Sequence, residues 1–99
     1  AIVQMLNYLP DTFAWRQETS GLPVRTKTGW QVKSNVFERG KPDIAGSKNG
    51  KSFVMEVKMP GGYLKPHQVS WLDDYERRGK GKKFVVHSIE EAESCWKEI

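Results

Sequence analysis

Two acidic residues and a lysine near the middle of the chain have the types and spacing of a hydrolytic site. Asp43 ends a Pro-Asp pair, and Glu56 and Lys58 form a Glu-x-Lys triplet on an apolar segment. Between them lies Asn49-Gly50, the strongest short sequence signal for a two-residue type I′ turn. A hairpin centred on this turn places Asp43 directly opposite Glu56, with Lys58 on the same face of the strand.

Directly opposed carboxylates repel each other, so another group has to compensate their charge. Mg²⁺ or Mn²⁺ fits this requirement, because both prefer oxygen ligands and bind two carboxylates together with water and a substrate phosphate. Two acids, a lysine and such an ion are typical of phosphodiester hydrolysis, in which Lys58 stabilises charge on the phosphorus or orients the nucleophile. The alternative is that Pro-Asp is only a turn dipeptide, as we expect for Pro10-Asp11.

Composition and charge limit the class of protein. The 99 residues, 37% of them hydrophobic, predict a single domain over 1–99 around one core. No apolar run is long enough to span a bilayer, so we expect a soluble protein with no membrane partner. The chain begins at Ala1 without a signal-peptide pattern, and we expect it to be cut from a slightly longer one. A net charge of +4 suits a polyanionic partner.

Cysteine and histidine give no support for zinc or for a nucleophilic triad. Cys95 is the single cysteine, which excludes an internal disulfide and fits a reducing cytoplasm. His67 and His87 are the two histidines and lie far apart in the sequence. We expect structural roles for all three residues.

The spacing of apolar residues predicts an α/β protein with a mixed central sheet flanked by helices, in the order α-β-(β)-β-β-α-β-α. The expected elements are a helix over 2–9, a strand over 12–16, the hairpin over 43–58, a helix from Pro66 stopped by Gly79, a strand over 82–87, and a last helix opened by a Ser88–Glu91 capping box and running through Trp96. Residues 22–41 fit either a hairpin around Thr28-Gly29 or a mobile strand that contacts phosphates.

Four segments, taken together, resemble a known nuclease family. They are Trp15–Gly21, an arginine-containing strand that runs into a small-residue loop; Gly40–Ile44, a Gly-x-Pro-Asp motif; Phe53–Lys58, a hydrophobic strand with Glu-x-Lys; and Gln68–Leu72, a helix start with Gln. This combination resembles the virus-type replication-repair nuclease (VRR-Nuc) family of the PD-(D/E)xK nuclease superfamily. The resemblance implies the restriction-endonuclease-like α-β-β-β-α-β core, here with an additional C-terminal helix.

By this resemblance Asp43, Glu56 and the main-chain carbonyl of Val57 bind Mg²⁺ or Mn²⁺. Lys58 is the implied catalytic lysine, and Gln68 supports the lysine or the phosphate. If the resemblance is set aside, we expect Gln68 to be a solvated residue in the first turn of its helix.

Arg16 and the absence of an acidic residue from the first helix also bear on this resemblance. Arg16 either steadies a phosphate or pairs with an acidic neighbour. The family usually has a Glu on its first helix, whereas this chain has no acid before Asp11. Truncation upstream would explain the difference.

Small stand-alone members of this family imply a DNA endonuclease that acts on branched DNA, including Holliday junctions, in a bacterial or phage-infected cytoplasm. One domain has one active centre, and symmetric cleavage of a four-way junction needs two, so we expect a homodimer. Its interface would draw on large apolar residues: Trp30, Val36, Phe37, Trp71 and Trp96. The residues expected to contact DNA are Arg16, Lys27, Lys33, Arg39, Lys41 and Lys65.

Three alternatives remain open from the sequence. Flap cleavage or single-strand nicking would use the same residues. A non-catalytic nucleic-acid-binding module would use the basic residues to position phosphates, with the carboxylates paired to lysines. A phage structural or protein-interaction domain would bind neither metal nor DNA.

Overall fold

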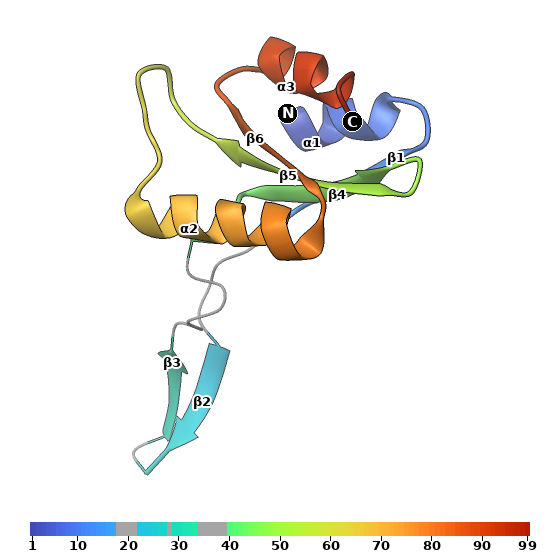
Figure 1. Cartoon of the computed structure of the whole chain (residues 1–99). Helices are drawn as coiled ribbons and strands as arrows, with labels where there is room; N and C mark the ends of the chain where they lie inside the picture. The colour runs from blue at the N-terminus through green and yellow to red at the C-terminus, as the bar shows by residue number, and fades with distance from the viewer. Residues whose placement is uncertain (18–21, 28, 34–39) are drawn as a thin grey trace.

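A four-stranded sheet lies between helices, with α1 and α3 on one face and α2 on the other (Figure 1). The computed structural model describes residues 1–17, 22–27, 29–33 and 40–99, with the backbone alone at 22–26 and 30–33. The elements of this layered part are α1 (Ile2–Tyr8), β1 (Thr12–Arg16), β4 (Ile44–Lys48), β5 (Lys51–Val57), α2 (Pro66–Asp74) with a π-helical continuation η2 (Tyr75–Gly79), β6 (Lys82–Val86) and α3 (Ile89–Trp96). The expected α/β architecture is confirmed.

The sheet is mixed, as expected, in the order β1-β4-β5-β6. β4 pairs antiparallel with both β1 and β5, whereas β5 and β6 are parallel and are connected through α2. The β4–β5 turn has positive φ at Asn49 (50°) and at Gly50 (81°), as a type I′ turn requires. Lys48 pairs with Lys51 and Ala45 with Val54, so the predicted register is correct.

Apolar side chains fill both layers between the sheet and its helices. The larger cluster, under α1 and α3, consists of Leu6, Ala14, Ile44, Phe53, Met55, Val86 and Ala92. The smaller cluster, under α2, consists of Ala45, Val54 and Leu72. Because neighbouring residues of β5 alternate between these clusters, the strand is buried on both faces, which explains its continuous apolar sequence.

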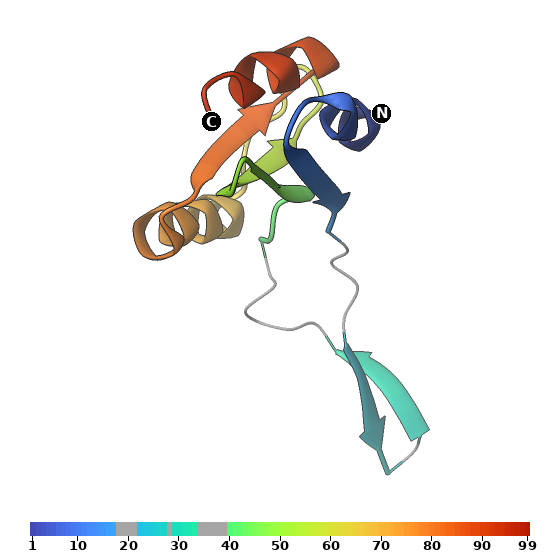
Figure 2. The same ribbon diagram turned by 90° about the vertical axis from the view of Figure 1, so that its right-hand side faces the viewer.

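The segment between β1 and β4 contains a second hairpin. β2 (Leu22–Thr26) and β3 (Gly29–Lys33) pair antiparallel, with Thr26 opposite Gly29 at the turn. Of the two arrangements left open by the sequence, the structure has the hairpin. Figure 2 shows this hairpin projecting away from the sheet, from the same end at which β1 ends and β4 begins.

The end of the α2–η2 helix differs from the expectation. Gly79 is the last residue of η2, and the left-handed residue that ends the helix is Lys80 (φ 61°). Gly81, the residue after Lys80, instead makes room for Tyr75, because a Cβ there would lie 2.1 Å from the Tyr75 hydroxyl oxygen. A Cβ on Gly79 would make only an ordinary van der Waals contact with the Tyr75 ring, at 3.4 Å. The helix therefore ends on a left-handed lysine rather than on a glycine cap, with Tyr75 packed against Gly81.

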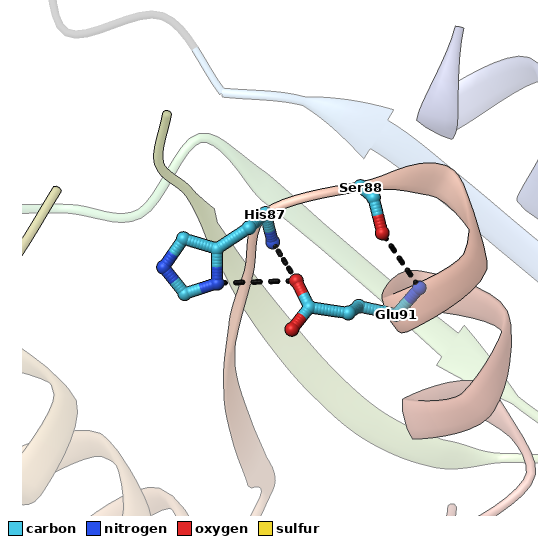
Figure 3. Close-up of polar contacts among 3 residues, drawn as sticks. All are labelled: His87, Ser88 and Glu91. Carbon is cyan, nitrogen blue, oxygen red and sulfur yellow. Dashed lines mark hydrogen bonds and ion pairs between the residues drawn. The ribbon is translucent and has the colours of Figure 1, made fainter. Parts of the chain in front are cut away.

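Helix α3 begins at the expected capping residue, with one change of partner (Figure 3). The Ser88 hydroxyl oxygen accepts a hydrogen bond from the Glu91 N–H at 3.1 Å. The Glu91 carboxylate accepts from the main-chain N–H of His87, not from that of Ser88, and also lies 3.1 Å from His87 Nδ1. His87 thus orders the start of α3, which agrees with the structural role expected for it.

None of the helices in the described ranges is long and apolar enough to cross a membrane.

The Asn7 side chain of α1 bonds to the outer edge of β1. The Asn7 amide oxygen accepts the Ala14 N–H at 2.9 Å, and the Asn7 amide nitrogen donates to the Ala14 carbonyl at 2.9 Å. The same nitrogen also donates to the Val3 carbonyl. Asn7 therefore satisfies the backbone groups of Ala14 that a neighbouring strand would otherwise pair.

We expect Asn7→Ala to lower the free energy of unfolding by about 1–2 kcal/mol, because it removes both hydrogen bonds to Ala14. Urea unfolding followed by circular dichroism measures this change. Gln4→Ala is the control, since Gln4 is exposed on the same helix. A loss no larger than that of the control would contradict the role of Asn7.

Candidate active site

Two acids meet where the β4–β5 hairpin ends. Asp43 directly precedes β4, and continuation of the register from Ile44 and Met55 places it opposite Glu56. An Asp43 carboxylate oxygen accepts the Val57 N–H at 3.0 Å, and its main-chain carbonyl accepts the Gln17 N–H at 2.7 Å. Glu56 is 3% exposed. The expected juxtaposition of the two carboxyl groups is confirmed.

The Glu56 carboxyl keeps its proton far above the usual range. Burial, a hydrogen bond to the Asp43 side chain and the Asp43 charge raise the pKa of Glu56 to about 8, although the charge of Lys58 opposes this shift. At neutral pH the Glu56 carboxyl therefore retains its proton. A proton in this position compensates the same repulsion that a metal ion would compensate.

Lys58 and Gln68 lie beside the acids, in contact with each other. The Lys58 ammonium donates to the Gln68 amide oxygen at 3.0 Å. The Gln68 amide nitrogen donates to a Glu56 carboxyl oxygen at 3.4 Å. The Gln68 amide oxygen also accepts the main-chain N–H of Lys65 at the start of α2. Gln68 is thus bonded to both the lysine and the acid, not simply solvated in the first turn of its helix.

The loop before Asp43 packs closely against the start of α2, and Gly40 permits this contact. Gly40 has a φ of +87°, and a Cβ there would lie 2.4 Å from the His67 carbonyl oxygen and 3.2 Å from the Gln68 Cα. Only glycine fits both the backbone conformation and the available space. The Gly of the Gly-x-Pro-Asp motif therefore sets the distance between Asp43 and the helix that bears Gln68.

A cavity of about 460 Å³ borders Asp43 on the side of α1 and α3. Its wall includes Arg16, Val57 and Ile89. Arg16 is exposed and forms no ion pair with any carboxylate of the described residues. The acidic neighbour of its second expected role is therefore none of the described carboxylates, and Glu18 lies outside the described residues.

The other residues expected to contact DNA are spread over the molecule. Lys27 is exposed at the turn of the β2–β3 hairpin, and Lys65 is exposed at the N-cap of α2. Lys41 is half-buried in the loop before Asp43. Only the backbone of Lys33 is described, and Arg39 lies outside the described residues.

Sequence reasoning missed a basic segment, Arg77–Lys83. Arg77 pairs with Asp74 at 2.6 Å and Lys83 with Asp73 at 2.5 Å, whereas Arg78, Lys80 and Lys82 have no ion pair within the described ranges. β6 pairs Lys82 with Phe53 at one end and Val86 with Val57 at the other. The segment therefore lies at the end of the sheet opposite the acids. The density of basic residues in the sequence would have revealed it.

The expected interface residues are partly engaged within the chain. The Trp71 ring stacks on Tyr75 with centroids 5.5 Å apart. Trp96 donates its indole N–H to the Thr12 hydroxyl, and the Lys48 ammonium lies 3.9 Å above its ring. The Trp30 side chain, Val36 and Phe37 lie outside what the structure describes. Different aromatic residues are exposed: Tyr8, Phe13, Trp15 and Tyr63.

Cys95 is half-buried in α3, where burial and the nearby charges of Glu98 and Glu91 raise the pKa of its thiol. A raised pKa disfavours the nucleophilic thiolate. This agrees with a structural role for Cys95.

The donor set of the site is small and made of oxygen. Among the described side chains no group of three or more His, Cys, Asp and Glu comes together to bind a metal. Two carboxyl groups with a neighbouring main-chain carbonyl nevertheless suit Mg²⁺ or Mn²⁺, which bind few protein ligands and retain water.

The chain matches no protein-family model, no curated protein and no solved structure.

We expect Gly40→Ala to reduce stability more than Gly61→Ala. Both glycines have a similar positive φ, +87° and +82°, but a Cβ on Gly61 would meet no atom within 4 Å. The control should lose about 1–2 kcal/mol from backbone strain, and Gly40→Ala about 1–3 kcal/mol more from the collision with α2. Chemical denaturation of the two variants measures the difference. Equal losses would show that the loop does not need its close contact with α2.

We expect the metal-free protein to lose stability as pH rises from about 4.5 to about 8. The Glu56 carboxyl loses its proton near 4.5 when unfolded and near 8 when folded, so the folded state binds more protons in this window. The effect is at most about 5 kcal/mol and should be absent in Glu56→Gln. Urea unfolding in EDTA across this pH range tests it, and parallel profiles for the two proteins would contradict the raised pKa.

Proposed function

We propose that this domain is a Mg²⁺- or Mn²⁺-dependent DNA endonuclease of the PD-(D/E)xK type. The observation that supports it best is the bonded group of Asp43, Glu56, Lys58 and Gln68 at one end of the sheet. The order α1-β1-β4-β5-α2-β6 also agrees with an α-β-β-β-α-β core, with the β2–β3 hairpin inserted and α3 added. The proposed fold family and the proposed chemistry thus rest on the same strands.

The two acids fit a hard divalent cation. Asp43 and Glu56 supply carboxylate oxygens, and the main-chain carbonyl of Val57 is the third proposed ligand. When bound, the ion would polarise the scissile phosphate and lower the pKa of a water. Glu56 must release its proton for this, and the nearby Lys58 charge favours the ionised carboxylate.

Lys58 and Gln68 act on the phosphate and on each other. A bond to the Gln68 amide oxygen fixes the Lys58 ammonium near the acids, so its charge is already positioned before a phosphate arrives. Gln68 also contacts Glu56, which makes it a positioning residue for both groups. Arg16 lines the cavity beside Asp43 and pairs with none of the described carboxylates, so it is placed to bind a neighbouring phosphate.

The proposed substrate is branched DNA, and the proposed active form is a homodimer that resolves four-way junctions. The net charge of +4 favours a polyanionic partner. Lys27 at the turn of the β2–β3 hairpin and Lys65 at the start of α2 would supply further contacts to phosphates. Flap cleavage or nicking of a single strand would use the same centre.

The competing proposal is a nucleic-acid-binding module without catalysis. In its favour, both acids have partners within the chain. Glu56 retains its proton and accepts from Gln68, and Asp43 accepts the Val57 N–H. Dependence on a divalent metal separates the two proposals, because only the enzyme requires one.

We expect Asp43→Asn and Lys58→Ala each to lower the rate of DNA cleavage by at least about 100-fold, since each removes a charged group at the reacting phosphate. Binding of a four-way junction should change little. Cleavage of labelled junction, flap and linear DNA with Mg²⁺ or Mn²⁺ measures the rates, and gel shift in EDTA measures binding.

Asp11→Asn and Lys51→Ala are the matched controls. Asp11 belongs to the other Pro-Asp pair, and Lys51 is an exposed lysine at the far end of β5. Both should cut like wild type. Equal cutting by all variants, or no cutting of any of these DNAs by wild type, would rule out the enzyme.

A further inference from the structure

Two exposed aromatic rings lie side by side on the outer strand of the sheet. Phe13 is 68% exposed and Trp15 is 46% exposed. Their ring centroids are 6.0 Å apart, with the planes inclined at 54°. We call these two residues the aromatic pair. Exposed neighbouring rings on a small domain are costly to hydrate, so they call for a functional explanation.

The aromatic pair lies on the face of the sheet that bears the acids. Phe13 and Trp15 flank Ala14, which faces the opposite layer under α1 and α3. Trp15 pairs with Ala45, and Ala45 pairs with Val54, both of which pack under α2. α2 covers this face over β4 and β5 but leaves the rings on β1 exposed.

Trp15 is a diagonal neighbour of Asp43 on this face of the sheet. It pairs with Ala45, and Asp43 lies two residues from Ala45 along the chain, towards the end where β1 stops. Diagonal neighbours of this kind are typically about 7–8 Å apart. Glu56 lies one strand further on, opposite Asp43. A strand of nucleic acid at the acids would therefore extend onto the aromatic pair without a change of face.

The backbone edge beside these rings is closed to a further β-strand. The Asn7 amide occupies both the N–H and the carbonyl of Ala14, the residue between them. A partner cannot use these groups for strand addition, so the surface that remains available is formed by the ring faces.

The charge of the chain favours a polyanion over a second copy as the occupant. The net charge of +4 attracts a nucleic acid to these rings but gives a second copy no such attraction. The row that contains Phe13 continues through Ser47 and Ser52, which add no negative charge. Flat apolar rings next to a phosphate-directed site match a nucleobase attached to its backbone.

We propose that unpaired bases of the substrate strand stack on Phe13 and Trp15. This inference rests on the proposed function and specifies its substrate: DNA with a single-stranded segment next to the cleaved phosphate. Stacking accepts any base, because each has a flat π-face. Bases inside an intact duplex are stacked on one another and do not reach the rings, so the site selects open or branched DNA.

The test measures binding without metal, so that it does not depend on cleavage. The probes are a fluorescein-labelled oligothymidylate of about 12 nucleotides and an abasic strand of equal length and charge, titrated by fluorescence anisotropy in EDTA. Wild type should bind the oligothymidylate more tightly than the abasic strand. The double variant Phe13→Ala, Trp15→Ala should lose about tenfold or more in affinity for the oligothymidylate and little for the abasic strand.

Tyr8→Ala is the matched control, because Tyr8 is 90% exposed and lies on α1. It should leave both affinities unchanged. Thermal unfolding checks that the double variant is folded, and Trp15→Tyr, which retains a ring, should keep most of the preference for bases.

An unchanged preference in the double variant would overturn the proposal. A second result would also overturn it: if light scattering shows a dimer for wild type and a monomer for the double variant, the rings belong to an interface with a second copy. If the nuclease proposal fails, because Asp43→Asn cuts like wild type, the binding difference is still measured and still decides the role of the rings.

Discussion

A buried carboxyl group beside a second carboxyl group is the constraint on which this structure depends. Glu56 is nearly inaccessible at the end of β5, and the antiparallel pairing with β4 places Asp43 against it. Two negative charges at this spacing in a poorly solvated site are strongly unfavourable. The protein avoids them by retaining a proton on Glu56, with a pKa of about 8, and by giving Asp43 the Val57 N–H. Such stored repulsion is typical of sites that bind a cation or transfer a proton.

Several elements exist in their observed form because they support this pair. Gly40 lets the loop before Asp43 touch the first turn of α2. That contact brings Gln68 within reach of both Lys58 and Glu56. Behind the site, the larger apolar cluster under α1 and α3 fixes β4 and β5. The favourable free energy of packing in this apolar cluster thereby offsets the unfavourable free energy of holding the two carboxyl groups together.

The two faces of the sheet differ in how much of them is covered. α1 and α3 together cover one face, whereas α2 alone packs on the other, over Ala45 and Val54 (Figure 1). The uncovered part of that face bears Phe13 and Trp15, and the acids lie beside it. Because only one helix covers this side, an exposed apolar surface remains next to the charged residues. A nucleic acid strand has matching parts, since its bases are flat and apolar and its phosphates are charged.

The β4–β5 hairpin could be predicted residue by residue, because its determinants are local. Asn49 and Gly50 fix the turn, the turn fixes the register, and the register brings Asp43 to Glu56. Periodicity and capping residues likewise gave most helix and strand positions. The end of the α2–η2 helix was predicted incorrectly, because the left-handed residue is Lys80, next to the place where Tyr75 packs against Gly81. That packing depends on residues of different elements.

The sequence by itself determined the α/β class and the mixed sheet, from the residue spacing within successive segments, and the meeting of the two acids, from the turn between them. Only the tertiary structure decided the rest. The bond from Lys58 to Gln68, the buried state of Glu56, and the exposure of Phe13 and Trp15 instead of Trp71 and Trp96 each depend on which elements pack together. Long-range packing sets solvation, and solvation sets both the pKa of Glu56 and the surface available to a ligand.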